Sequence, residues 1–89
     1  MKMDENWIRS FKEKLDNHYA WPALYTFKFI VSKGKEAEVK KLFPQNEAKE
    51  KMSSQGKYTS LTINTMMPSS DAIIKIYHDA ARIEGIIAL

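Results

Sequence analysis

A glycine turn that leads into an alternating strand constrains the fold of this chain more than any other stretch. The segment Ser53–Thr65 opens with two serines and Gly56, and then alternates polar residues with Leu61 and Ile63. Glycine supplies the positive φ that a tight turn requires, and the alternation is typical of a strand with one buried face. We therefore expect a β-hairpin whose second strand lies in the middle of an antiparallel sheet.

The segment Leu24–Ser32 predicts a second central strand. One face of it is entirely apolar and consists of Tyr25, Phe27, Phe29 and Val31. The other face is mixed and includes Lys28. We expect the apolar face to be buried under helices and the mixed face to stay in contact with water.

The remaining elements follow from periodicity and from residues that end helices. They are a short helix at 36–43, a charged edge strand at 47–54, a long helix that starts at Ser69 or Ser70 and ends at Gly85, and a short apolar strand at 86–89. Pro44 ends the short helix, and the charge of the edge strand discourages pairing with other chains. The order is strand, helix, strand, strand, helix, strand. With right-handed crossovers it predicts an α+β, ferredoxin-like βαββαβ domain over residues 21–89, in which two helices cover one face of a four-stranded antiparallel sheet.

Residues 1–20 predict an extra amphipathic helix outside that domain. Asp4 can cap it, and Trp7, Ile8 and Phe11 begin an apolar stripe at helical spacing. The stripe needs a partner, which is either this domain or a second copy of the chain. Trp7, Ile8 and Phe11 are therefore candidate contacts of a homodimer.

Composition excludes several classes of function. The chain has 89 residues, with 14 Lys and Arg against 11 Asp and Glu, and its formal net charge is +3. Acidic residues lie between the lysines almost everywhere, so the sequence shows no basic tract of the kind that nucleic-acid binders concentrate on one face. The absence of cysteine excludes disulfides, thiolate metal sites and thiol catalysis. The sequence predicts neither a signal peptide nor a membrane span, and we expect a cytoplasmic protein.

No combination of residues predicts a catalytic or metal site. His18 and His78 are far apart in the sequence, and neither has a second histidine or an acidic pair at ligand spacing. Asp79 adjoins His78 but lies about 100° away around the helix, so we do not expect it to orient the ring. The sequence therefore predicts no enzyme, no metal and no cofactor.

The polar face of the sheet is the candidate binding surface. Its predicted members are Lys28, Tyr58, Ser60, Thr62 and Asn64. They can form a platform for a small metabolite or a protein partner, or an ordinary hydrated face. The loop Ser53–Lys57 can hold an anion through backbone N–H groups, although the turn already requires Gly56 for its backbone geometry.

RNA binding is an alternative because RNA-recognition motifs have the same strand order. Those motifs stack bases on aromatic side chains of the open sheet face. Phe27 and Phe29 are in phase with the buried face, and only Tyr58 remains as a platform. The pattern therefore disfavours RNA as the partner.

Three segments resemble one family. They are WPALYTFK at 21–28, SSQGKYTS at 53–60, and the terminal helix with its short apolar strand. These segments resemble the YbeD-like family, whose members are described as proposed lipoate regulatory proteins or as a domain of unknown function. The resemblance covers roughly residues 21–89 and implies a fold similar to the small-molecule-binding ACT domains, a regulatory role and no catalysis.

Two functions follow as expectations. The first is a non-enzymatic regulatory or binding module that binds a metabolite or a protein through the open sheet face. The second is a homo-oligomeric assembly protein that uses the N-terminal helix and the same face.

Overall fold

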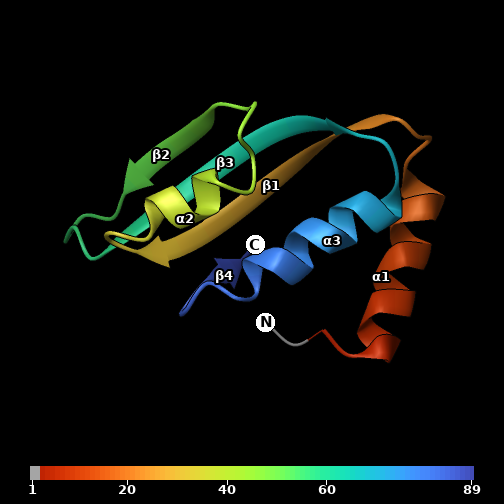
Figure 1. Ribbon diagram of the computed structural model, residues 1–89, viewed down its shortest axis with the longest axis horizontal. Helices are drawn as coiled ribbons and strands as arrows, with labels where there is room; N and C mark the ends of the chain where they lie inside the picture. The colour runs from red at the N-terminus through yellow and green to blue at the C-terminus, as the bar shows by residue number, and fades with distance from the viewer. Residues whose placement is uncertain (1–2) are drawn as a thin grey trace.

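Two long central strands pair along their whole length in the computed structural model, which describes residues 3–89 (Figure 1). Strand β1 (Ala23–Ser32) lies antiparallel to β3 (Tyr58–Met67), from the pair Ala23–Met67 to the pair Ser32–Tyr58. Strand β2 (Ala48–Met52) pairs with β3, and β4 (Ile87–Ala88) pairs with β1. The resulting order is β2-β3-β1-β4, all antiparallel, as expected for a ferredoxin-like fold.

The hairpin between β2 and β3 forms at the predicted glycine turn. Gly56 has a φ of 69°, in the region that favours glycine. The N–H of Ser53 donates to the carbonyl of Tyr58 at 2.8 Å, and the N–H of Gly56 donates to the carbonyl of Ser53 at 2.9 Å. These bonds fix which residue of β2 faces which residue of β3.

One face of the sheet forms the core under α2 (Glu36–Lys40) and α3 (Ser70–Ala80). The largest fully buried side chains are Phe27, Phe29, Val31, Val39, Leu61, Ile63 and Ile73. They come from both central strands and both covering helices, so the predicted inward faces of β1 and β3 are confirmed.

Several element boundaries differ from the sequence prediction, including those of the edge strand, which is Ala48–Met52 and not 47–54. Helix α2 ends at Lys40, and hydrogen-bonded turns carry the chain from there to the buried side chain of Phe43. Strand β3 continues to Met67, because Ala23 and Leu24 at the start of β1 supply backbone partners for its last two residues. Helix α3 ends at Ala80 and not at Gly85.

The segment that follows α3 is a tighter coil. The N–H of Ile83 donates to the carbonyl of Ala80, and the N–H of Ile86 donates to the carbonyl of Ile83. Bonds between residues three apart place side chains at that spacing on one side, and Ile83 and Ile86 are both buried. Gly85, with a φ of 75°, then turns the chain into β4.

Helix α1 (Glu5–His18) begins after Asp4, the cap that the sequence predicts. The carboxylate of Asp4 accepts a hydrogen bond of 2.8 Å from the backbone N–H of Trp7. Figure 1 shows α1 crossing near the N-terminal end of α3. Leu15 is only 4% exposed and belongs to the same core as the sheet.

The apolar stripe of α1 has partners within the chain. Ile8 and Phe11 are partly buried against the core, and the ring of Phe11 lies 5.6 Å from that of Tyr77 on α3. The ring of Trp7 lies 4.9 Å from that of Phe11. The candidate homodimer contacts Trp7, Ile8 and Phe11 therefore already pack on one another or on α3.

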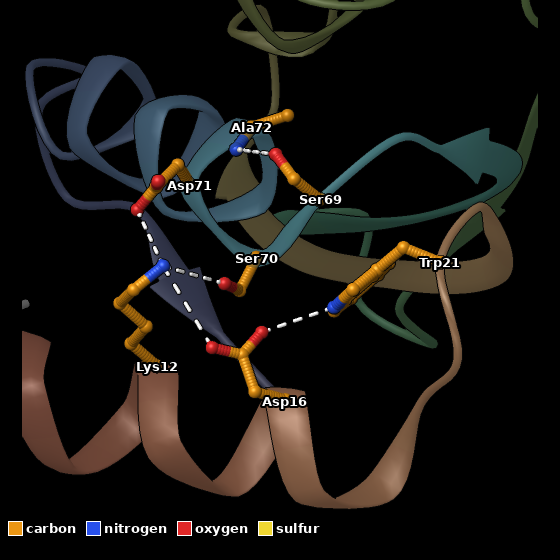
Figure 2. Close-up of polar contacts among 7 residues, drawn as sticks. All are labelled: Lys12, Asp16, Trp21, Ser69, Ser70, Asp71 and Ala72. Atoms are coloured by element: carbon orange, nitrogen blue, oxygen red, sulfur yellow. Dashed lines mark hydrogen bonds and ion pairs between the residues drawn. The ribbon is translucent and has the colours of Figure 1, made fainter.

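Polar groups also join α1 to α3, as Figure 2 shows. The Nζ of Lys12 donates to the hydroxyl of Ser70 and to the carboxylate of Asp71, each at 3.0 Å. The indole N–H of Trp21 donates to Asp16 at 3.0 Å. The hydroxyl of Ser70, followed by that indole, lowers the pKa of Asp16, and the Asp71 carboxylate raises the pKa of Lys12. These contacts hold both groups in their charged forms at the helix crossing.

Candidate functional site

The register of the sheet places all five predicted surface residues on its uncovered side. Tyr58, Ser60, Thr62 and Asn64 alternate along β3 with buried or half-buried residues. Lys28 lies directly across from Thr62 on the neighbouring strand. We call this surface the open face.

Three lysines share the open face. Thr62 lies between Lys28 on β1 and Lys49 on β2, and Ser60 lies beside Lys51 on β2. All three lysines are exposed, and none of them forms an ion pair within residues 3–89. The sequence prediction included only Lys28.

The acidic residue of β2 lies on the other side of the sheet. Glu50 pairs with the buried Leu61 in the register, so its side chain is directed toward the helices. There it forms an ion pair of 2.7 Å with Lys40 of α2. The lysines and the glutamate of β2 therefore lie on opposite faces of the sheet. All charged strand residues that face the open side are positive.

An apolar hollow of about 430 Å³ lies at one end of the open face. Ile30, Met52, Tyr58 and Ile87 are the apolar residues that line it. Met52, Tyr58 and Ile87 are 53%, 51% and 51% exposed. Lys51 and Ser60 also line it, so the hollow joins the row of lysines.

Only part of this site could be recognised in the sequence. The alternation of β2 contained the signal for Lys49 and Lys51, which follow the period of the open face. Ile87 gave no such signal, because its place beside Ile30 depends on the register of a two-residue strand. Ile30 itself lies on the predicted mixed face of β1, but nothing local indicated that it borders a hollow.

The middle of the open face is linked by a side-chain hydrogen bond. The hydroxyl of Thr26 donates to the side-chain oxygen of Asn64 at 2.6 Å. The two residues are directly opposite each other on β1 and β3. This bond occupies the amide oxygen of Asn64, and its amide N–H groups remain as donors on the open face.

The serines of the hairpin loop serve the turn. The hydroxyl of Ser53 accepts a hydrogen bond of 3.2 Å from the backbone N–H of Tyr58. Together with the backbone bonds of the turn, this contact uses the N–H groups of Ser53, Gly56 and Tyr58 within the hairpin. The geometry of the hairpin therefore accounts for Ser53 and Gly56 of this loop.

The histidines do not come together. His18 packs edge-on against Tyr19 at the end of α1, whereas His78 is exposed on α3. The Nδ1 of His78 lies 4.0 Å from a carboxylate oxygen of Asp79, beyond hydrogen-bond distance. Over residues 3–89, no three side chains among His, Asp and Glu are grouped so that they could hold a metal ion.

Two partly buried polar contacts belong to the fold and not to the open face. The hydroxyls of Tyr25 and Tyr77 lie 3.0 Å apart among aromatic rings, and burial raises the pKa of both. The carboxylate of Glu36 accepts hydrogen bonds of 2.7 Å from the hydroxyl of Thr59 and from the backbone N–H of Gly34. Thr59 is only 3% exposed, so this bond joins α2 to the inner side of β3.

Comparisons with known proteins identify the family of the chain. None of the helices within residues 3–89 combines the length and apolar character that a membrane span requires. No curated protein and no solved structure matches the chain. The model of one family, described as "Protein of unknown function (DUF493)", matches residues 16–89, which include every element of the sheet and both of its covering helices. The chain therefore belongs to this YbeD-like family of unknown function.

Proposed function

We propose that this protein is a non-enzymatic, regulatory binding module of the cytoplasm that acts through its open face. The observation that carries the proposal is the contrast between the two sides of the sheet. The helix side is filled by the core, whereas the open side combines three lysines that form no ion pair within residues 3–89 with an apolar hollow. Concave apolar surface beside a few polar groups is the usual composition of a binding site.

The rigid support beneath the open face favours binding over a merely hydrated surface. Lys28, Ser60 and Thr62 are attached to strands whose opposite side chains are fully buried. A partner would therefore meet side chains on a backbone that is already ordered, and the loss of conformational freedom on binding is small.

Photo-crosslinking in the cells that make the protein tests the proposal. A photo-reactive phenylalanine analogue replaces Thr62 in the middle of the open face, and the matched control carries the same analogue at Glu13 on the exposed side of α1. We expect specific adducts from position 62 and none from position 13. Adding Lys28→Ala and Asn64→Ala should reduce the yield of the adduct several-fold, because both side chains are donors on that surface.

The mass of each adduct shows whether it is a small molecule, a nucleic acid or a protein. Adducts that form equally from both positions, or a yield that the double variant does not change, would remove the open face as the binding surface.

A further inference from the structure

We infer that the partner of the open face is an acidic segment of another protein, which places one large apolar side chain in the hollow. This inference rests on the proposed function and specifies what that surface binds. Charge, shape and symmetry each contribute one step to it.

The charge of the open face selects a partner with several negative groups. Lys28 and Lys49 are on the two strands that flank β3, roughly 10 Å apart across two strand spacings. Lys51 lies two residues further along β2, beside the hollow. One carboxylate does not balance three ammonium charges that are distributed over these strands. Carboxylates spread over a protein segment can balance them.

The shape of the hollow favours a protein segment over a free metabolite. A typical small-molecule site encloses 70–90% or more of its ligand's surface. Here Met52, Tyr58 and Ile87 are each about half exposed, and no helix of the described part of the chain covers them. A small molecule in the hollow would stay in contact with water on one side, whereas a protein partner covers the hollow with its own surface. Met52 can also adapt its flexible side chain to that surface.

Symmetry disfavours a second copy of the chain as the occupant. In a two-fold dimer formed through the open face, the same patch of both copies would meet. Such a contact would bring the three lysines of one copy against the three of the other, with no carboxylate of the strands between them. Like charges brought together in an interface oppose association.

The chemistry of the hollow also disfavours nucleic acid, although phosphates would suit the lysines. Single-stranded nucleic acid gains much of its affinity by stacking bases on aromatic side chains. Among the strand residues that face the open side, Tyr58 is the one aromatic residue, and the other apolar residues that line the hollow are Ile30, Met52 and Ile87. An aliphatic hollow fits a Leu, Ile, Met or Phe side chain of a protein.

Selection from a library of random short peptides tests the inference, with the full chain as the bait. We expect the enriched peptides to carry several Asp or Glu residues around one large apolar residue. A parallel selection uses Lys28→Glu/Lys49→Glu, and we expect it to enrich Lys and Arg in place of the acidic residues. Such a change in the charge of the selected peptides shows that binding is specific. An unfolded or non-specifically adsorbing protein would not produce it.

The enriched peptides are then measured by titration, with backbone amide spectra of the labelled protein as the readout. We expect the largest shifts at Ile30 and Ile87, and Lys28→Glu should weaken binding at least about tenfold. The matched control Lys14→Glu makes the same change of charge on the exposed side of α1 and should leave affinity within about twofold. Ile87→Ser should also weaken binding, and Met52→Ser at an exposed edge position tests the hollow again if Ile87→Ser does not fold.

Three results would overturn the inference. They are enrichment of neutral or basic peptides by the unaltered chain, no enrichment at all, and a single-stranded RNA that binds the open face more tightly than any peptide. A small-molecule or nucleic-acid adduct at position 62 would also overturn it while leaving the proposed function standing. Without any adduct at that position, both proposals fail.

Discussion

Glu36 joins the start of α2 to the preceding turn and to β3. It is the first residue of α2, and its carboxylate accepts hydrogen bonds from the backbone N–H of Gly34 and from the hydroxyl of Thr59. The Thr59 hydroxyl, followed by the backbone N–H groups of Glu36 and Gly34, lowers the pKa of this carboxyl below its ordinary value of 4.5. The folded protein therefore prefers Glu36 in its charged form.

The stability of the protein should depend on pH through this residue. Since the folded pKa of Glu36 is lowered, its contribution is fully present above about pH 4.5 and is lost as the pH falls through the folded value. We expect Glu36→Gln to lower the free energy of unfolding at pH 7, and the difference from the unaltered protein to shrink between pH 5 and pH 3. Urea unfolding at a series of pH values measures this difference.

A second glutamate of α2 provides the control for that series. Glu38 is exposed, and within residues 3–89 its only ion pair is with Lys35 on the same segment, at 3.3 Å. Glu38→Gln removes the same charge without breaking a contact to β3, so a small and nearly constant difference is expected. Parallel curves for Glu36→Gln and the unaltered protein would mean that the bridge to Thr59 does not stabilise the fold.

At the level of elements, α1 packs into the core as the other helices do. Leu15 is as buried as the strand residues, and Phe11 adds its ring to the aromatic cluster around Tyr77. The contacts of Lys12 with Ser70 and Asp71 fix the helix at the start of α3. Burial, aromatic packing and charge thus act at the same crossing.

Truncating Leu15 measures this contribution. We expect Leu15→Ala to lower the free energy of unfolding by about 2–5 kcal/mol, because a buried leucine leaves both lost apolar contacts and a cavity. Lys14→Ala, on the exposed side of the same helix, should change it by less than about 0.5 kcal/mol. Chemical unfolding of both variants decides the point. Equal, small effects would mean that α1 is only loosely attached.

The order of the elements could be predicted from the sequence because two signals agreed. Alternation predicted which residues of β1 and β3 face the core, and Gly56 predicted the turn that fixes the register of β2 against β3. The end of α3 could not be predicted, since Ile83 fits both a helix and a tighter coil until its hydrogen bond to Ala80 is known.

The open face was likewise predicted only along the long strands. Its residues on β1 and β3 were predicted from alternation, and the alternation of β2 contained the signal for Lys49, whereas Ile87 enters only through the pairing of β4 with β1. Pairing is a contact between distant segments, so a local pattern does not contain it. The hollow is made of four such segments, which explains why no stretch of sequence indicated it.

At the scale of the whole molecule, the two surfaces considered for self-association are both poorly suited to it. Trp7, Ile8 and Phe11 pack within the chain, and the open face would bring lysines together. We expect the full chain to sediment as a monomer of 10.3 kDa. We expect Lys28→Glu/Lys49→Glu to sediment as a monomer too. A dimer of this variant would mean that repulsion between the lysines alone prevents the unaltered chain from associating.

A dimer of the unaltered chain at micromolar concentration would contradict this expectation. Comparison with Phe11→Ser and Tyr58→Ser would then show whether α1 or the open face forms the contact.

The alternation of β1 and β3 separates two kinds of evolutionary constraint within single strands. A change at Phe29 or Leu61 alters the core and with it the folded state. A change at Lys28 or Ser60, one residue away, alters only what the surface offers to a partner. Descendants of one ancestral sequence could therefore exchange partners by single substitutions while retaining an unchanged scaffold.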